Sequence, residues 1–143
     1  MTTSTNAVQT HHHPAETVIN AIVVGLTLVT AAVHLSLGGP LFTLNAIGYA
    51  TLATLIVLPG PVAQVRWLVR LALMGFTSAT IVGWILVGGR FPLAYVDKAV
   101  ELVLVTFLAA EVWTIDGGPL AILNRIGHLI RSIASLGRNR RIA

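Results

Sequence analysis

The chain has 143 residues, of which 55% are hydrophobic and only 10% are charged, and its formal net charge is +4. A soluble globular protein carries about 25% charged residues, so this composition indicates a membrane protein with a single membrane domain. The absence of cysteine excludes disulfides, thiolate metal sites, thiol redox relays and c-type haem attachment.

Residues 1–16 form a predicted polar tail. It contains three histidines, His11 to His13, which could contact a metal ion but which we interpret as part of a solvated polar tail. No lysine or arginine precedes residue 17. A signal peptide has a basic segment before its apolar core, so the first apolar run is expected to be a retained span.

Four apolar runs follow the tail, and each is long enough to cross a bilayer. At about 1.5 Å of rise per residue, about 20 helical residues cross the hydrocarbon layer of roughly 30 Å, and a helix satisfies its own backbone there. The predicted spans are 17–37, 41–58, 65–87 and 93–115. Because the connections are short, successive helices should be antiparallel neighbours. The predicted fold is all-α, an up-down-up-down four-helix bundle within residues 17–116.

The pattern becomes periodic after Pro119. Residues 119–136 place apolar side chains on one side of a helical wheel and polar ones on the other, which predicts an amphipathic helix lying at the membrane surface. Residues 137–143 are a predicted basic tail. A surface for anionic lipid or for a partner protein is expected at Arg125, Arg131, Arg138, Arg140 and Arg141.

The basic residues also predict the orientation. Arg66 and Arg70 flank the start of the third span, and the five arginines above follow the fourth. By the positive-inside rule, these sides face the cytoplasm, so both termini should be cytoplasmic in a bacterial-type inner membrane. The same rule explains the positive net charge without nucleic acid, which is not a predicted partner.

Polar side chains within the spans gather on one side of each helix. A charge facing lipid at the midplane costs about 2.5 to 3.5 kcal/mol, so these sides should point into the bundle. Near the cytoplasmic side, we predict an inner ion pair of Glu111 with Arg66 and Arg70. Near the opposite side, the predicted ligand site or polar cluster consists of His34, Asn45, Tyr49, Trp84, Asp97 and Glu101.

Several roles are open for His34, because imidazole can bind haem iron or a pigment, hydrogen-bond a quinone, relay a proton, or simply hydrogen-bond Asn45 or Glu101. No metal, cofactor or catalytic motif occurs, so an enzyme is not expected and the cofactor stays unknown. We expect a non-catalytic accessory or structural subunit of a larger membrane complex, of the energy-converting (respiratory or photosynthetic) kind, that contacts other membrane subunits. The alternatives are a small oligomeric transporter or channel, and a haem- or pigment-binding subunit using His34.

Overall fold

The protein is entirely helical over the residues that the structure describes. The computed structural model describes residues 14–114 and 117–139, and no strand occurs within these ranges. In chain order the helices are α1 (Pro14–Leu37), α2 (Pro40–Val57), α3 (Pro61–Gln64), α4 (Arg66–Val87), α5 (Pro92–Thr114) and α6 (Gly118–Asn139). The predicted all-α class is therefore confirmed.

Three helices are long and apolar enough to cross a membrane: α1 over Thr17–Leu37, α2 over Pro40–Val57 and α4 over Arg66–Val87. This finding confirms the prediction of a membrane protein. The segment expected as a fourth span forms α5, which has the required length but carries four charged residues. These are Asp97, Lys98, Glu101 and Glu111.

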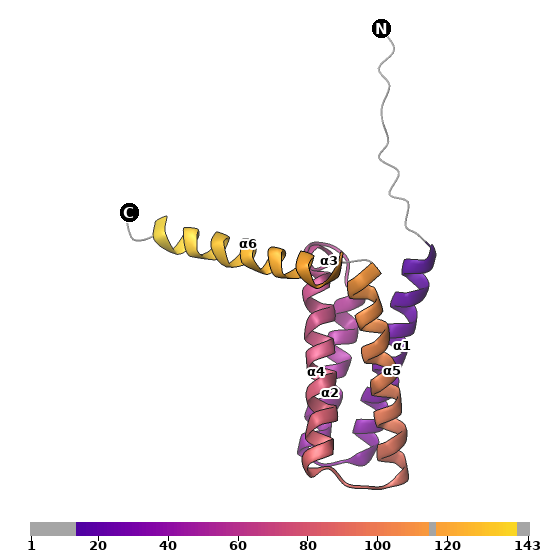
Figure 1. Cartoon of the computed structure of the whole chain (residues 1–143). Helices are drawn as coiled ribbons and strands as arrows, with labels where there is room; N and C mark the ends of the chain where they lie inside the picture. The colour runs from indigo at the N-terminus through magenta and orange to yellow at the C-terminus, as the bar shows by residue number, and fades with distance from the viewer. Residues whose placement is uncertain (1–13, 115–116, 140–143) are drawn as a thin grey trace.

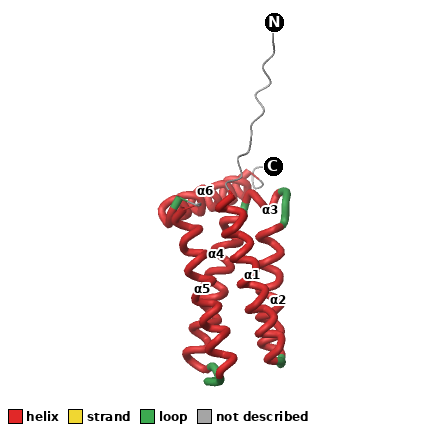
Figure 2. Tube along the Cα trace, turned by 90° about the vertical axis from the view of Figure 1, so that its right-hand side faces the viewer, coloured by secondary structure: helices red, strands yellow, loops and turns green. Residues whose placement is uncertain are grey.

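α1, α2, α4 and α5 lie side by side (Figures 1 and 2). α1 packs against α2 and α5, and α4 packs against the same two helices. α1 begins and α5 ends at the end of the molecule that carries α3 and α6, which we call the α6 end (Figure 1). The opposite end, which we call the loop end, carries the α1–α2 turn and the loop from α4 to α5.

Glycine and proline shape the turns. Gly38 and Gly39 have φ values of +68° and +86°, a left-handed conformation that side chains disfavour, and Pro40 then begins α2. Proline also begins α1, at Pro14, so that helix includes the last three residues of the predicted polar tail. Gly60 and Pro61 similarly open α3, a short helix that the sequence pattern does not predict.

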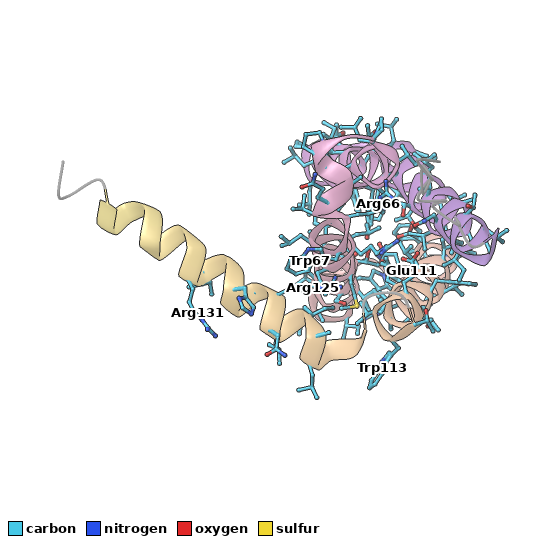
Figure 3. The ribbon with its side chains drawn as sticks, turned by 90° about the horizontal axis from the view of Figure 1, so that it is seen from above. Arg66, Trp67, Glu111, Trp113, Arg125 and Arg131 are labelled. Atoms are coloured by element: carbon cyan, nitrogen blue, oxygen red, sulfur yellow. The ribbon has the colours of Figure 1, made fainter. Side chains whose placement is uncertain are left out.

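α6 also runs further than predicted, through Asn139, because one glycine near the end of a helix costs only about 1 kcal/mol. The rest of the two predicted tails, 1–13 and 140–143, lies outside the described residues, as do residues 115 and 116. Among the described helices α6 contacts α5 alone, and it projects sideways from the α6 end (Figures 1 and 3).

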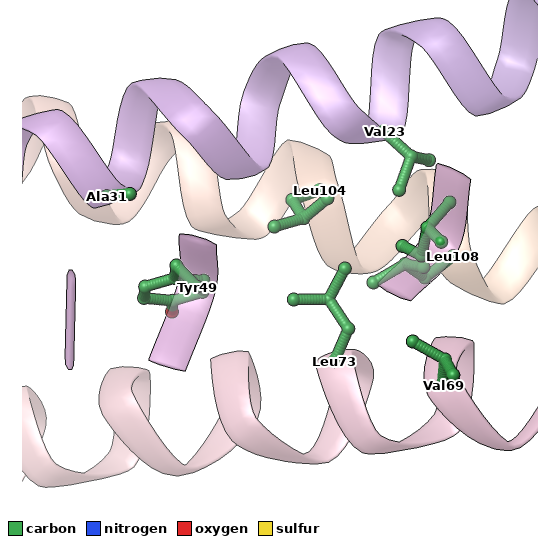
Figure 4. Packing of buried hydrophobic residues seen from close by; sticks show 8 residues of the cluster. Val23, Ala31, Tyr49, Val69, Leu73, Leu104 and Leu108 are labelled. Atoms are coloured by element: carbon green, nitrogen blue, oxygen red, sulfur yellow. The ribbon is translucent and has the colours of Figure 1, made fainter. Parts of the chain in front are cut away.

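An apolar layer lies between α1, α2, α4 and α5 near the middle of their length. Val23, Leu73, Leu104 and Leu108 are fully buried and belong to one apolar cluster (Figure 4). Along α1, α4 and α5 these residues come between the polar side chains of the loop end and those of the α6 end. The apolar layer therefore separates the two polar groups of the interior.

Candidate functional site

A buried charged cluster lies between the apolar layer and the loop end. It consists of His34 from α1, Tyr49 from α2, and Asp97, Lys98 and Glu101 from α5, none of which is more than 8% exposed. We call these five residues the loop-end cluster. Because charged side chains are rarely buried unless they are paired, the contacts of each member matter.

Lys98 pairs with both carboxylates of the cluster. Its Nζ atom lies 3.1 Å from Asp97 Oδ2 and 2.5 Å from Glu101 Oε2. Glu101 follows Lys98 by three residues, so the two side chains share one face of α5. A single ammonium group thus bridges two carboxylates on the same helix.

The second carboxylate oxygen of Glu101 forms hydrogen bonds that link α5 to α2 and α4. Glu101 Oε1 accepts hydrogen bonds from the hydroxyl of Tyr49, at 2.9 Å, and from that of Thr80 in α4, at 3.0 Å. The two hydroxyl oxygens are themselves 2.9 Å apart. Both carboxylate oxygens therefore have partners, as a buried charge requires.

His34 lies between the two carboxylates. Its Nδ1 is 3.0 Å from the carbonyl oxygen of Thr30, and since a carbonyl only accepts, Nδ1 carries a proton in this arrangement. Asp97 Oδ1 is 3.6 Å from the same nitrogen, and Glu101 Oε1 is 3.9 Å from Nε2. A second proton, on Nε2, would face a carboxylate.

The charges of the cluster do not balance when the imidazole is neutral. Two carboxylates and one ammonium leave a net charge of −1, and a doubly protonated His34 brings it to zero. His34, Asp97 and Glu101 each offer one metal-ligand atom within 4.8 Å of the others. However, the Lys98 ammonium already lies against both carboxylates, so the arrangement favours a network of charges over a metal centre.

A cavity of about 390 Å³ adjoins the loop-end cluster and is lined by residues of α1, α2, α4, α5 and the loop between the last two. Its walls are largely apolar and include Phe42, Phe76 and Phe91. His34, Asp97 and Lys98 form its charged wall. The Oδ1 atom of Asp97 is buried without a hydrogen bond within the described part of the chain. The cavity thus combines an aromatic lining with the side chain of a buried carboxylate.

The structure distributes the six predicted residues between the cluster and the cavity. His34, Tyr49, Asp97 and Glu101 belong to the loop-end cluster, whereas Asn45 and Trp84 line the cavity. The Trp84 indole donates a hydrogen bond to the carbonyl of Gly89 at 2.9 Å, and the Arg90 guanidinium lies 4.2 Å from its ring centre. Trp84 therefore fixes the loop beside the cavity.

The predicted site does not include Lys98 and Thr80. Thr80 follows Thr77 by three residues, a spacing that indicates the same inward face of α4. Lys98 follows Asp97 directly, which places its Cβ about 100° away around the helix. Its long side chain nevertheless reaches the carboxylates.

A second polar group lies toward the α6 end. Arg70 Nε is 3.3 Å from Glu111 Oε2, and Arg70 Nη2 donates to Asn20 Oδ1 at 3.1 Å. Arg66 is half-buried, and its Nε has no hydrogen bond within the described part of the chain. Arg70 is thus the arginine that contacts Glu111; both Arg66 and Glu111 are labelled in Figure 3.

The predicted basic surface is only partly described. Arg125 and Arg131 are exposed on α6 (Figure 3). The side chains of Arg138, Arg140 and Arg141 lie outside those that the structure describes.

Comparison of the chain with protein-family models, with curated proteins and with solved structures finds no match. Its function is therefore argued from the chemistry of the loop-end cluster and the cavity beside it. That chemistry consists of a buried charged cluster, whose net charge is −1 when His34 is neutral, next to an aromatic cavity.

Proposed function

We propose that this protein is a four-span inner-membrane protein that binds a small amphipathic molecule in the cavity at its loop end. The observation that carries the proposal is the cavity of about 390 Å³ whose charged wall is formed by His34, Asp97 and Lys98. Ligand sites are typically concave and mostly apolar, about 300 to 1,000 Å³ in volume, with a few polar groups that orient the ligand. This cavity has those properties.

The burial of the α5 charges supports a fourth span. Asp97, Lys98, Glu101 and Glu111 are all buried, while the exposed large side chains of α5 are apolar or aromatic. Tyr95 and Trp113 are exposed near the two ends of α5. At about 1.5 Å of rise per residue they are about 27 Å apart along the helix, which suits residues of the two aromatic belts of a bilayer.

The α6 end is proposed to face the cytoplasm. Arg66, Arg70, Arg125 and Arg131 all belong to that end, as the positive-inside rule requires of the inner face. α6 leaves the bundle sideways, which is the direction of an amphipathic helix on the membrane surface (Figure 1). Its basic side chains would then lie among anionic lipid headgroups.

The energetic cost of the loop-end cluster also supports a binding role. Removing ions from water costs several kcal/mol for each ion, and well-packed apolar side chains often replace a buried ion pair without loss of stability. Ionisable residues inside a membrane are accordingly typical of functional sites. The apolar layer separates the cavity from the α6 end, which favours a one-sided binding site over an open pore.

The arrangement disfavours a haem or pigment on His34. Nδ1 is used by the carbonyl of Thr30, and Nε2, the nitrogen left for an iron or magnesium ion, faces Glu101 Oε1 at 3.9 Å. Membership of a larger, energy-converting assembly stays a prediction and is compatible with a binding role. Purification in mild detergent, with a visible absorption spectrum and identification of co-purifying subunits, tests both ideas.

The proposed topology can be tested with introduced cysteines, since the chain has none of its own. An impermeant maleimide added to intact spheroplasts should label Arg90→Cys, in the α4–α5 loop. It should label Gln64→Cys in α3 and Asn124→Cys in α6 only after lysis. Labelling of Asn124→Cys from the same side as Arg90→Cys would show that α5 does not cross the membrane.

The binding role can be tested by filling the cavity. Gly83 lines the cavity and a side chain there would meet open space, so Gly83→Phe should occupy the cavity without touching the charges. Gly75, on the same helix, also has open space around it but does not line the cavity, which makes Gly75→Phe the matched control.

Three small aromatic probes suit this cavity: neutral benzyl alcohol, cationic benzyltrimethylammonium and anionic benzenesulfonate. At least one of them should bind the wild type and Gly75→Phe in detergent by titration calorimetry, and bind Gly83→Phe at least tenfold more weakly, roughly the effect of lost contact in a pocket. The proposal is wrong if none of the probes binds, or if Gly83→Phe binds as well as the control.

A further inference from the structure

We infer that the ligand of the cavity is an organic monocation, an alkyl- or aryl-substituted ammonium ion, and that it competes with a proton on His34. This inference rests on the proposed function and names the chemical class that the cavity takes. Its starting point is the charge of the loop-end cluster. Asp97 and Glu101 outnumber the single ammonium of Lys98, so the cluster lacks one positive charge when His34 is neutral.

A single added cation is therefore favoured at this position. An uncompensated buried charge is strongly disfavoured in a medium of low dielectric constant, and in a bilayer the disadvantage persists along most of the span. A monocation restores neutrality, whereas a neutral or anionic ligand leaves the imbalance or increases it. Charge balance thus selects for one positive charge in the ligand.

The contacts indicate where that charge would lie. Lys98 already occupies Asp97 Oδ2 and Glu101 Oε2, and Tyr49 and Thr80 occupy Glu101 Oε1. Asp97 Oδ1 is the carboxylate oxygen of the cluster left without a hydrogen bond within the described residues, on a side chain only 2% exposed that lines the cavity. The cationic group of the ligand would lie against the Asp97 side chain where it lines the cavity.

The rest of the cavity suits an organic cation better than a metal ion. Phe42, Phe76 and Phe91 line it, and aromatic faces attract ammonium groups while accommodating their apolar substituents. A divalent metal ion needs about six oxygen ligands or retained waters, which apolar walls do not supply. It would also be repelled by the Lys98 ammonium between the two carboxylates.

A proton on His34 can supply the same missing charge. Its imidazole faces Asp97, Lys98 and Glu101 from α5 and the phenol of Tyr49 from α2, and α4 contributes no titratable side chain at this depth, only the hydroxyl of Thr80. With Nδ1 donating to Thr30, the second proton belongs on Nε2. Entry of the ligand cation would release this proton to the solution through the cavity, so the total charge stays at zero.

The direct test is the pH dependence of binding of benzyltrimethylammonium to the wild-type protein in detergent. This probe has a permanent charge, so a change in its affinity with pH reports the protein. Binding should weaken as the pH falls, by up to about tenfold per pH unit, the limit for one exchanged proton. Benzenesulfonate should not bind.

Two variants refine the test, with Gly75→Phe as the control that leaves the cavity intact. His34→Gln removes the titrating group, so its binding should not vary with pH, whatever its affinity. Asp97→Asn makes the remaining charges neutral, so it should bind the cation at least about tenfold more weakly, as expected when a buried charge partner is lost. Calorimetry of the wild type in two buffers with different ionisation enthalpies should show proton release at the acid pH values where the affinity has fallen, and this measurement does not depend on the folding of any variant.

The possible failures distinguish the two proposals. Binding of benzyl alcohol or benzenesulfonate without binding of the cation would overturn the inference and leave the proposed function standing. Cation binding by the wild type that is independent of pH and releases no proton would overturn the competition with His34. If no probe binds, the proposed function itself fails.

Discussion

The hydrogen bond from Tyr49 to Glu101 offers a quantitative test of how the loop-end cluster stabilises the bundle. Tyr49 is fully buried in α2, and its hydroxyl donates to Glu101 Oε1 at 2.9 Å. Its ring packs edge-on against Phe76, with ring centres 4.9 Å apart. Tyr49→Phe removes the hydroxyl and keeps the ring, so it isolates the hydrogen bond from the apolar packing.

The expected loss is about 1 to 2 kcal/mol in the free energy of unfolding. A hydrogen bond to a charged group contributes about 1.5 to 3 kcal/mol in net terms, while interhelical hydrogen bonds measured in a membrane protein average about 0.6 and reach about 1.7 kcal/mol. Glu101 would keep Lys98 and Thr80 as partners after the substitution. The charge is therefore not left unpaired, which keeps the loss below that of a broken ion pair.

The assay is equilibrium unfolding in mixed micelles by addition of dodecyl sulfate, followed by circular dichroism. Tyr95→Phe is the matched control, because Tyr95 is 53% exposed. Loss of its hydroxyl should change the free energy of unfolding by less than about 0.5 kcal/mol. A double-mutant cycle combines Tyr49→Phe with Glu101→Gln to measure the coupling free energy between the two side chains. Equal effects of the two tyrosine changes, or a coupling near zero, would refute the assigned hydrogen bond.

Three further predictions use the same unfolding assay. Glu111→Gln should cost about 3 to 5 kcal/mol because it breaks the buried ion pair with Arg70, and combination with Arg70→Met should recover part of that loss; an additive double variant would contradict the pair. Gly48→Ala should cost about 1 to 3 kcal/mol because its new methyl group would lie 2.7 Å from Phe76 Cζ, whereas Gly75→Ala, in open space, should be neutral or stabilising. The stability of the full chain should rise with the fraction of anionic lipid in the micelles, and deletion of 118–143 should abolish that rise; an unchanged dependence would exclude a lipid-binding role of α6.

The helical class and the membrane environment were predictable because they depend on local properties. Long apolar runs predict both the helical conformation and a bilayer environment. The short turns containing Gly39 or Gly60 separate one run from the next. The cost of a charge in lipid also favoured an inward direction for Asp97, Glu101 and Glu111, and all three are buried. These inferences need no knowledge of which helices are neighbours.

The partners of the buried charges were less predictable because they depend on the register between helices. Arg66 and Arg70 are one turn apart on the same helix, so either arginine was a candidate for Glu111, and only the packing of α4 on α5 brings Arg70 into contact. Lys98 lies about 100° from Asp97 on a helical wheel, but its flexible side chain reaches the Asp97 carboxylate as well as that of Glu101. A wheel describes Cβ directions and misses the reach of long side chains.

The pairing of charges along α5 bears on how the protein enters the membrane during synthesis. Because Lys98 neutralises a carboxylate of its own helix, the first half of α5 does not depend on another helix for its principal ion pair. Glu111 has no basic residue within α5 beyond Lys98, and its cation, Arg70, comes from the preceding long helix. An unpaired charge costs about 2.5 to 3.5 kcal/mol at the centre of an inserting helix. α4 and α5 are therefore expected to leave the translocon together as a hairpin, with the arginine–glutamate contact formed before either helix reaches lipid.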